Sequence, residues 1–380
     1  MDLKLSKDQE MLQREARHFF RQQMPIEKVL SLVDSDTGFD PDLWRAMAEL
    51  GWLGVVVPEE YGGVGGTFLD LVVLLQEIGR AGVPTPYFAT VLLGAVPIID
   101  LGSEAQKRKY LPSIAAGDSI FSLAMVEEEG NYDPASVQTM ARRERSGFRL
   151  SGCKLFVPHG LVADTLICIA REHDDRRRSI SSFVVDAKQA GVTRARMKTI
   201  TNQFYAEVSL KEAIAGADDR LTSADDGWNS TEGVLLKAAV GSCALAVGGA
   251  EHVLDMTVQY AKDRVQFDRP IGSFQAIQHH CADMLTEIDA CRLLTYEAAW
   301  RIAAGLPFEL EAAAAKAWCG ESYERVTKLG HQVHGGVGLI KEHAMYLYSR
   351  DARSTASLLG GSDYQREVIA GFLERTESLL

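Results

Sequence analysis

The sequence has few cysteines, and none of its six cysteines belongs to a CxxC pair. Paired cysteines at that spacing are typical of zinc sites and redox disulfides, and neither is expected here. Scattered single cysteines favour buried free thiols in a reducing compartment, which predicts a cytoplasmic protein. The residues after Met1 also lack the basic segment and the apolar core of a signal peptide.

Long apolar runs and basic surfaces are missing as well. No run of about eighteen apolar residues occurs, and the closest stretch, 233–249, contains Lys237 and many small residues. It predicts a buried helix rather than a membrane span. The net charge is −12 without a basic stripe, which argues against nucleic acid as a partner. The 380 residues, 46% hydrophobic and 24% charged, are typical of a globular protein with two or three domains.

The spacing of apolar residues changes twice along the chain, from a helical period to a strand period and back. This predicts domains at 1–120, 121–225 and 226–380. The first domain is expected to be helical. Ser6 and Gln9 form a capping-box pattern ahead of an apolar stripe at helical spacing. Further helices are predicted at 42–50, 68–81 and 103–116, and the glycine-rich segment 58–66 is predicted to be a loop.

The second domain has the short, alternating pattern of strands. Residues 148–157 predict two strands joined by a tight turn at Ser151-Gly152. Further strands are expected at 165–171, 179–186, 192–197 and 204–210, so the middle domain is predicted to be an antiparallel β domain.

The third domain returns to long helical patterns at 230–264, 274–304 and 309–332, joined by short connections. Long helices with short connections are typical of an antiparallel four-helix bundle. The fold class predicted for the whole chain is therefore mainly α with a middle β domain.

Two motifs in the third domain indicate a nucleotide site. The first is Tyr260-Ala-Lys-Asp-Arg-Val-Gln-Phe-Asp-Arg-Pro-Ile-Gly-Ser-Phe-Gln-Ala-Ile-Gln278, and the second is Gln332-Val-His-Gly-Gly-Val-Gly338. A guanidinium binds a pyrophosphate with two parallel hydrogen bonds, and a phenyl ring offers a flat apolar surface. Glycines at a helix end let backbone approach a ligand closely. A charged surface turn and a glycine helix cap explain each piece alone, but together they favour a dinucleotide site.

These motifs resemble those of the acyl-CoA dehydrogenase family. The resemblance extends to Gly51-Trp-Leu-Gly-Val-Val-Val-Pro-Glu-Glu-Tyr-Gly-Gly-Val-Gly65, to Leu101-Gly-Ser-Glu-Ala-Gln-Lys-Arg-Lys-Tyr-Leu-Pro112 and to the Arg350-Asp-Ala352 triplet. It implies an N-terminal helical domain, a middle β domain and a C-terminal four-helix bundle. It also implies FAD as the cofactor, acyl-CoA thioesters as substrates oxidised to trans-2-enoyl-CoA, and an electron-transferring flavoprotein as the usual acceptor. The residues that match the cofactor-binding groups of the family are Arg264, Phe267, Gln275, Gln332, Gly335 and Gly336.

The resemblance fails where the family keeps its catalytic base. Removal of the α-proton of a thioester requires a positioned base. Ungapped counting from the Arg350-Asp-Ala352 triplet places Leu359 at the usual glutamate, and the alternative base position on the first bundle helix falls on Ala238. Neither side chain can accept a proton. Asp363, four residues after Leu359 and able to share its helical face, and Glu367 are the fallback candidates.

The groups that contact the flavin ring in the family are also replaced. Hydroxyl-bearing residues of the family correspond here to Val126 and Pro158, whose side chains donate no hydrogen bond. A chain that keeps only the adenosine-diphosphate side resembles the degenerate subunit of a heterotetramer, which completes the FAD site of a paralogous catalytic chain. Two alternatives stay open: an active homotetramer with a relocated base, and a non-enzymatic acyl-CoA-binding scaffold.

Histidines recur at His279-His280 and at His331 and His334, but no further residues complete a metal-ligand set. No metal site is predicted.

Overall fold

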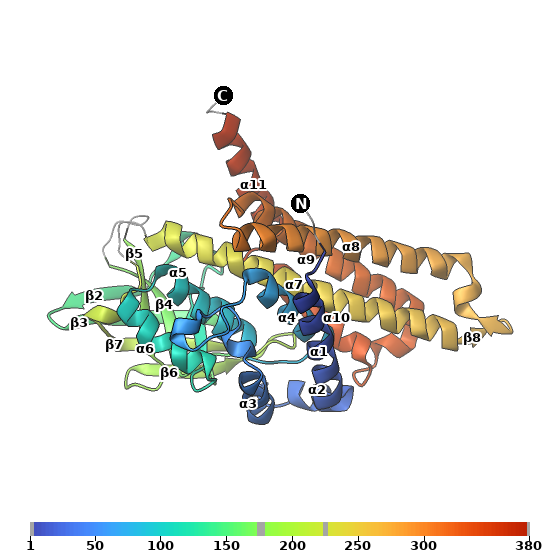
Figure 1. Cartoon of the computed structure of the whole chain (residues 1–380), viewed down its shortest axis with the longest axis horizontal. Coiled ribbons are helices and arrows are strands. Elements are labelled where there is room, and N and C mark those ends of the chain that lie inside the picture. The colour runs from blue at the N-terminus through green and yellow to red at the C-terminus, as the bar shows by residue number, and fades with distance from the viewer. Residues whose placement is uncertain (1–3, 173–178, 223–226, 378–380) are drawn as a thin grey trace.

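The computed structural model describes residues 4–172, 179–222 and 227–377 of the chain. It has an N-terminal helical part, a middle sheet and a C-terminal helical bundle. This confirms the predicted fold class. In Figure 1 the sheet lies at the left, the bundle extends to the right, and α1 to α4 lie in the middle and lower part. The first strand begins at Phe121, and the first bundle helix begins at Gly227.

The N-terminal part is a set of short helices whose starts follow from their caps. Ser6 and Gln9 form the predicted capping box, and Ser103 and Gln106 form another. The π-helix η3 and the helices α2 and α5 were not predicted, because no side-chain cap precedes them. The helices are α1 (Lys7–Gln23), α2 (Ile26–Val33), α3 (Pro41–Glu49), α4 (Phe68–Ala81), η3 (Phe88–Ala95), α5 (Val96–Leu101) and α6 (Glu104–Ala115).

The middle domain is one seven-stranded sheet in the order β1-β4-β2-β3-β7-β6, with β5 beside β4. Most neighbours are antiparallel as predicted, but β1 and β4 run parallel, and β2 meets β4 in a parallel bridge. The strands are β1 (Phe121–Ala124), β2 (Met140–Glu144), β3 (Gly147–Pro158), β4 (Thr165–Arg171), β5 (Ile180–Asp186), β6 (Val192–Met197) and β7 (Tyr205–Gly216).

The predicted turn at Ser151-Gly152 is wrong. Both residues lie inside the twelve-residue strand β3, and the hairpin closes earlier, where Glu144 of β2 pairs with Gly147 of β3. A Cβ atom at Gly152 would lie 2.3 Å from Oγ1 of Thr139. The glycine therefore permits close packing at a register shift against β7, not a reversal of the chain.

The C-terminal part is built around α7, which extends from the sheet to the far end of the bundle (Figure 1). This helix is long and apolar enough to cross a membrane, but 83% of its most apolar window is buried inside the chain. The elements are α7 (Gly227–Asp263), β8 (Val265–Gln266), β9 (Arg269–Pro270), α8 (Gln275–Ala303), α9 (Glu309–His334), η7 (Gly335–Leu339), α10 (Ala344–Ser357) and α11 (Ser362–Glu377).

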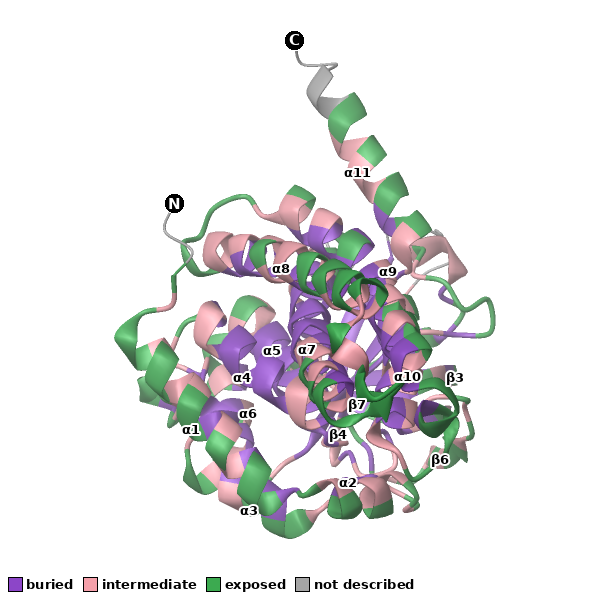
Figure 2. Cartoon of the chain, turned by 90° about the vertical axis from the view of Figure 1, so that its right-hand side faces the viewer, coloured by how far each residue is buried: buried purple, intermediate pink, exposed green. Residues whose placement is uncertain are grey.

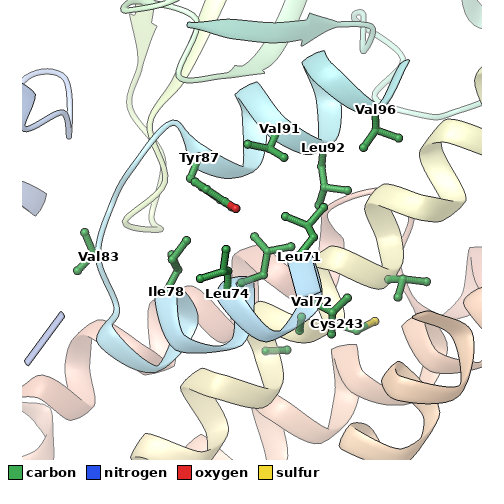
Figure 3. Close-up of a cluster of buried hydrophobic side chains, with 14 of the residues drawn as sticks. Leu71, Val72, Leu74, Ile78, Val83, Tyr87, Val91, Leu92, Val96 and Cys243 are labelled. Carbon is green, nitrogen blue, oxygen red and sulfur yellow. The ribbon is translucent and has the colours of Figure 1, made fainter. Parts of the chain in front are cut away.

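Helix α4 of the N-terminal part packs closely against helix α7 of the bundle. A Cβ atom at Gly248 would lie 1.8 Å from the carbonyl oxygen of Gln76, and one at Gly79 would lie 2.2 Å from that of Leu245. Figure 3 shows the apolar side chains of α4 and η3 facing one another beside Cys243 of α7. Figure 2 shows the buried residues gathered on these central helices, whereas α11 projects away from them.

Candidate active site

A cavity of about 80 Å³ lies where the three parts of the chain meet. Helices α4, η3 and α7 supply Ile78, Phe88 and Leu245, strands β3 and β7 supply Pro158 and Tyr205, and helices α9 and α10 supply Tyr323 and Asp351. Cavities at domain junctions are preferred positions for small-molecule sites. This cavity is therefore the candidate active site of the chain.

Asp351 is the carboxylate that the described chain places at this cavity. It lies on α10, and the side-chain amide of Gln203 donates a hydrogen bond to its Oδ1 atom at 3.3 Å. Burial raises the pKa of Asp351 to about 7, against this hydrogen bond and the positive charge of Arg350. A carboxyl group with such a pKa in a cavity is a candidate functional group.

His159 is the second titratable group at the cavity. Its ring is buried and stacks on Phe204 with centroids 5.8 Å apart, and its Nδ1 atom has no hydrogen-bond partner in the described residues. Burial lowers the pKa of His159 to about 4, so the imidazole is neutral at physiological pH. The residue follows Pro158 in β3 and has a positive φ of 49°.

Neither of the two base positions predicted from the resemblance is among the residues that line the cavity. Leu359 and Ala238 belong to one buried apolar cluster, with exposed fractions of 6% and 0%. The backbone N–H of Leu359 donates to the hydroxyl of Tyr132 at 2.9 Å, and its neighbour Leu358 lines the cavity instead. Both side chains are apolar, so neither can accept a proton.

The fallback carboxylates point elsewhere. The expectation that Asp363 shares a helical face with Leu359 is wrong, because Leu359 lies in the turn between α10 and α11 with a φ of 61°. The Asp363 side chain is 99% exposed and pairs with Arg366 at 2.9 Å, and Glu367 is also exposed. Neither carboxylate reaches the cavity.

A buried ion pair lies next to Val126, one of the two residues that stand where the family has hydroxyl donors to the flavin ring. Nζ of Lys154 lies 2.6 Å from Oε1 of Glu127, which also accepts a hydrogen bond from the hydroxyl of Thr139. Burial opposes it, but the charge of Lys154 keeps the pKa of Glu127 below its ordinary value. Val126 and Pro158 use their carbonyl oxygens to accept from Leu155 and Ser122, so their side chains leave no donor facing a ligand.

The predicted cofactor residues lie at the other end of the bundle, where α7 and α9 finish. The rings of Tyr260 and His334 stack at 4.5 Å, which brings the Arg264 segment beside Gln332, Gly335 and Gly336. Figure 1 shows the β8 hairpin at the end opposite the middle sheet. Arg264, Phe267, Gln275, Gln332, Gly335 and Gly336 are all exposed, and none of them lines the cavity.

The surface at this end suits a ligand approached from outside the chain. The ring of Phe267 is 85% exposed, and a Cβ atom at Gly335 or Gly336 would meet nothing within 4 Å. Within the described ranges the guanidinium of Arg264 has no hydrogen bond or ion pair, so its charge is available to an external anion. An exposed guanidinium, an exposed ring and open glycines fit the diphosphate part of a dinucleotide.

Comparisons with known proteins agree with this arrangement. Models of the acyl-CoA dehydrogenase N-terminal, middle and C-terminal domains match residues 6–118, 122–212 and 225–373. The 3-(aryl)acrylate reductase of Clostridium sporogenes is 33% identical over 96% of this chain and 98% of its own length. This chain belongs to the acyl-CoA dehydrogenase family.

Two solved structures are similar over nearly the whole chain. One is a chain from work on the electron transferring flavoprotein of Acidaminococcus fermentans, with 30% identity, a TM-score of 0.93, and coverage of 98% of this chain and 99% of that one. The other belongs to the ChsE4-ChsE5 complex from Mycobacterium tuberculosis, with 29% identity, a TM-score of 0.90, and coverage of 98% and 99%.

Membership of the acyl-CoA dehydrogenase family confirms the predictions of an oxidoreductase that acts on a CH–CH group and of FAD as the cofactor. The flavin of such a dehydrogenase supplies the hydride acceptor. The residues of this chain that would hold its diphosphate half are Arg264, Phe267, Gln332 and Gly336. No cluster of three or more metal-ligating side chains occurs in the described chain, including at His279, His280, His331 and His334.

Sequence reasoning missed Asp351 and His159 as site residues of this dehydrogenase-family chain. Asp351 belongs to the Arg350-Asp-Ala352 triplet that matches the family, so the sequence does mark this residue. The triplet was used only as the reference point for locating position 359, and Asp351 itself was not considered as a site residue. His159 follows the singled-out Pro158 directly, and no sequence pattern distinguishes a cavity-lining histidine from a packed one.

Proposed function

We propose that this chain is the non-catalytic subunit of a heteromeric acyl-CoA dehydrogenase. In this assembly it completes the FAD site of a paralogous catalytic subunit, which oxidises an acyl-CoA thioester to the trans-2-enoyl-CoA. The observation that carries the proposal is the buried apolar cluster around Leu359 and Ala238. A base typically contributes about 10²–10⁴-fold to proton removal, and an apolar side chain cannot replace it.

The exposed end of the bundle supports the second half of the proposal. Arg264 presents a charge and Phe267 an 85% exposed ring on the surface, and neither residue lines the cavity of this chain. They would be satisfied by a cofactor whose flavin lies in the neighbouring subunit. Similarity to a chain of the ChsE4-ChsE5 complex supports a heteromeric pair.

The assembly is proposed to be a tetramer that packs through the bundles. The apolar side chains that would form this contact are exposed in the single chain, with exposed fractions between 38% and 51%: Leu285 and Leu293 of α8, and Leu310 and Trp318 of α9.

An electron-transferring flavoprotein is proposed as the electron acceptor. Similarity to a chain from work on the electron transferring flavoprotein of Acidaminococcus fermentans supports this part of the proposal. A cytoplasmic location is part of the proposal, and all six cysteines are free as expected there.

The decisive experiment is an activity assay of the full chain alone and with its paralogous subunit. Acyl-CoA thioesters of several lengths, added FAD and an artificial electron acceptor are supplied. The lone chain should turn over far below one per second, a low rate for an enzyme, and the pair should be active. Comparable turnover by the lone chain would refute the proposal.

A pair of arginine variants tests the cofactor contact. Arg264→Ala should weaken flavin retention in the assembled pair by about 1.5–3 kcal/mol, the range for hydrogen bonds to charged groups. Arg145→Ala is a matched control, because Arg145 is exposed in the turn between β2 and β3. Equal flavin occupancy in the two variants would rule out the contact.

One observation favours the alternative of a self-sufficient flavoenzyme. Asp351 lines the cavity and has a pKa near 7, which suits a general base. If the lone chain proves active, Asp351→Asn should abolish that activity, whereas Asp363→Asn should leave it unchanged.

A further inference from the structure

The cavity at the domain junction contains a carboxylate without a cationic partner. In the described residues Asp351 accepts side-chain hydrogen bonds from the neutral amides of Gln203 and Asn202, and no ion pair joins it to a cation. The neighbouring Arg350 uses its guanidinium elsewhere: its Nε atom donates to the carbonyl oxygen of Ile200 at 2.5 Å and its Nη1 atom to the hydroxyl of Tyr346 at 3.0 Å. Buried charges are normally paired, so this carboxylate has an open place for a cation.

Aromatic rings surround the same carboxylate. Tyr205 and Tyr323 line the cavity with Asp351, and Tyr348 lies on α10 one turn before it. Burial raises the pKa of all three tyrosines, and the negative charge of Asp351 adds to each shift. Faces of aromatic rings attract cations. His159 is neutral at physiological pH and does not repel one.

Several other residues that line the cavity are apolar. They include Ile78 at the end of α4, Val83 in the following loop, Phe88 of η3 and Leu245 of α7. Figure 3 shows Ile78 on α4 and Val83 in the loop that follows this helix. A water needs about 10–15 Å³ in the same measure of volume, so about 80 Å³ admits a ligand of some five to eight non-hydrogen atoms.

We infer that this cavity binds a small organic ammonium ion with a compact apolar body. The ammonium group would donate to the carboxylate of Asp351 beside the rings of Tyr205 and Tyr323, and the body would pack on Ile78, Val83 and Leu245. This ligand class lies outside the acyl-CoA chemistry of the proposed function. The site would give the chain a ligand of its own, although it carries no base at positions 359 and 238.

The test compares two ligands of equal shape on the purified full chain by titration calorimetry. Cyclohexylammonium carries the charge, and cyclohexanol replaces it with a hydroxyl. Cyclohexylammonium should bind at least tenfold more tightly at pH 8. Asp351→Asn should remove this preference, whereas Asp363→Asn, which changes an exposed carboxylate outside the cavity, should preserve it.

The pH profile provides a second readout that needs no variant. Asp351 must be ionised to bind the cation, and the amine stays protonated between pH 6 and 8. With a pKa of about 7, the affinity for cyclohexylammonium should rise about tenfold over this range, because the ionised fraction of Asp351 rises by that factor. The other groups facing Asp351 are Arg350, the tyrosines and neutral His159, and none of them changes charge in this window.

Three outcomes overturn the inference: equal affinity for the two ligands, an affinity for cyclohexylammonium that is independent of pH, or full binding by Asp351→Asn. Should that variant not fold, the comparison of ligands and the pH profile of the native chain decide. The measurement uses no acyl-CoA and no partner subunit. Its failure is therefore distinct from a failure of the proposed function, which is judged by dehydrogenase turnover.

Discussion

Nζ of Lys316 on α9 donates a hydrogen bond to the carbonyl oxygen of Thr355 on α10 at 2.5 Å, and it lies 3.3 Å from that of Ala356. Lys316 is buried, with an exposed fraction of 1%. The last carbonyl groups of a helix lack intrahelical partners, and a lysine from another helix satisfies them here. Thr355 lines the cavity, so this contact fixes one wall of the site.

Substitution of this lysine should loosen α10. Lys316→Ala leaves two buried carbonyl oxygens without a donor, which costs about 1–3 kcal/mol. Urea unfolding measures the loss. Lys328→Ala changes an exposed lysine of the same helix and should alter stability by less than about 0.5 kcal/mol. Similar stability of the two variants would show that the contact contributes little.

Protonation of Asp351 should make stability depend on pH. Burial raises its pKa from 3.8 to about 7, so the folded chain holds this proton more tightly than the unfolded chain. Below pH 4 both states are protonated and the group has no effect. Between pH 4 and 7 only the unfolded chain releases the proton, so this group lowers stability as pH rises, by at most about 1.4 kcal/mol per pH unit.

Asp351→Asn should remove that contribution, since the amide stays neutral. The variant should therefore gain stability relative to the native chain as pH rises from 4.5 to 7.5, measured by urea unfolding at each pH. Asp363→Asn should follow the native profile, because its carboxylate is exposed in the folded chain. Parallel profiles for the native chain and Asp351→Asn would contradict the prediction.

The ion pair of Glu127 and Lys154 should be far more sensitive than a surface pair. Lys154 is fully buried, and Glu127→Gln leaves its charge unpaired, which costs about 3–5 kcal/mol. Asp42→Asn breaks the exposed pair with Arg45 and should cost less than about 1 kcal/mol. Thermal unfolding of both variants checks the contrast, and comparable losses would argue against it.

Two glycines of α7 should respond to alanine with opposite signs. Gly248→Ala places a methyl group 1.8 Å from the Gln76 carbonyl oxygen, so α4 must move, at a cost of about 1–3 kcal/mol or more. Gly233→Ala meets nothing within 4 Å and should stabilise the helix by about 0.5–1 kcal/mol. Denaturant midpoints measure both, and a stable Gly248→Ala variant would disprove the close contact.

The helices could be predicted where local signals were strong. The helix predicted at 68–81 has those bounds in the structure, because Thr67 caps it and Gly82 ends it with a left-handed φ. The strand β3 was misread, because a glycine that packs on Thr139 has the same sequence signature as a turn glycine. Sequence alone does not tell these two roles apart, since the contact comes from another part of the sheet.

The site was predicted only in part for a similar reason. The resemblance predicts that Leu359 and Ala238 hold the base positions, and both belong to one buried cluster in the structure. Asp351 and His159 became visible only with the cavity, whose lining comes from eight helices and strands and the loops between them. Such a junction depends on long-range packing, which no local pattern encodes.

The apolar cluster around Leu359 and Ala238 also bears on how such a chain can change over evolutionary time. A single Leu359→Glu or Ala238→Glu substitution places a carboxylate in a buried apolar cluster, where an unpaired charge is costly. Each step back towards a base thus destabilises the fold before any activity returns, and Val126 and Pro158 would still offer the flavin no donor. Once these two positions have become part of the core, selection for stability therefore opposes the return of a carboxylate at either of them.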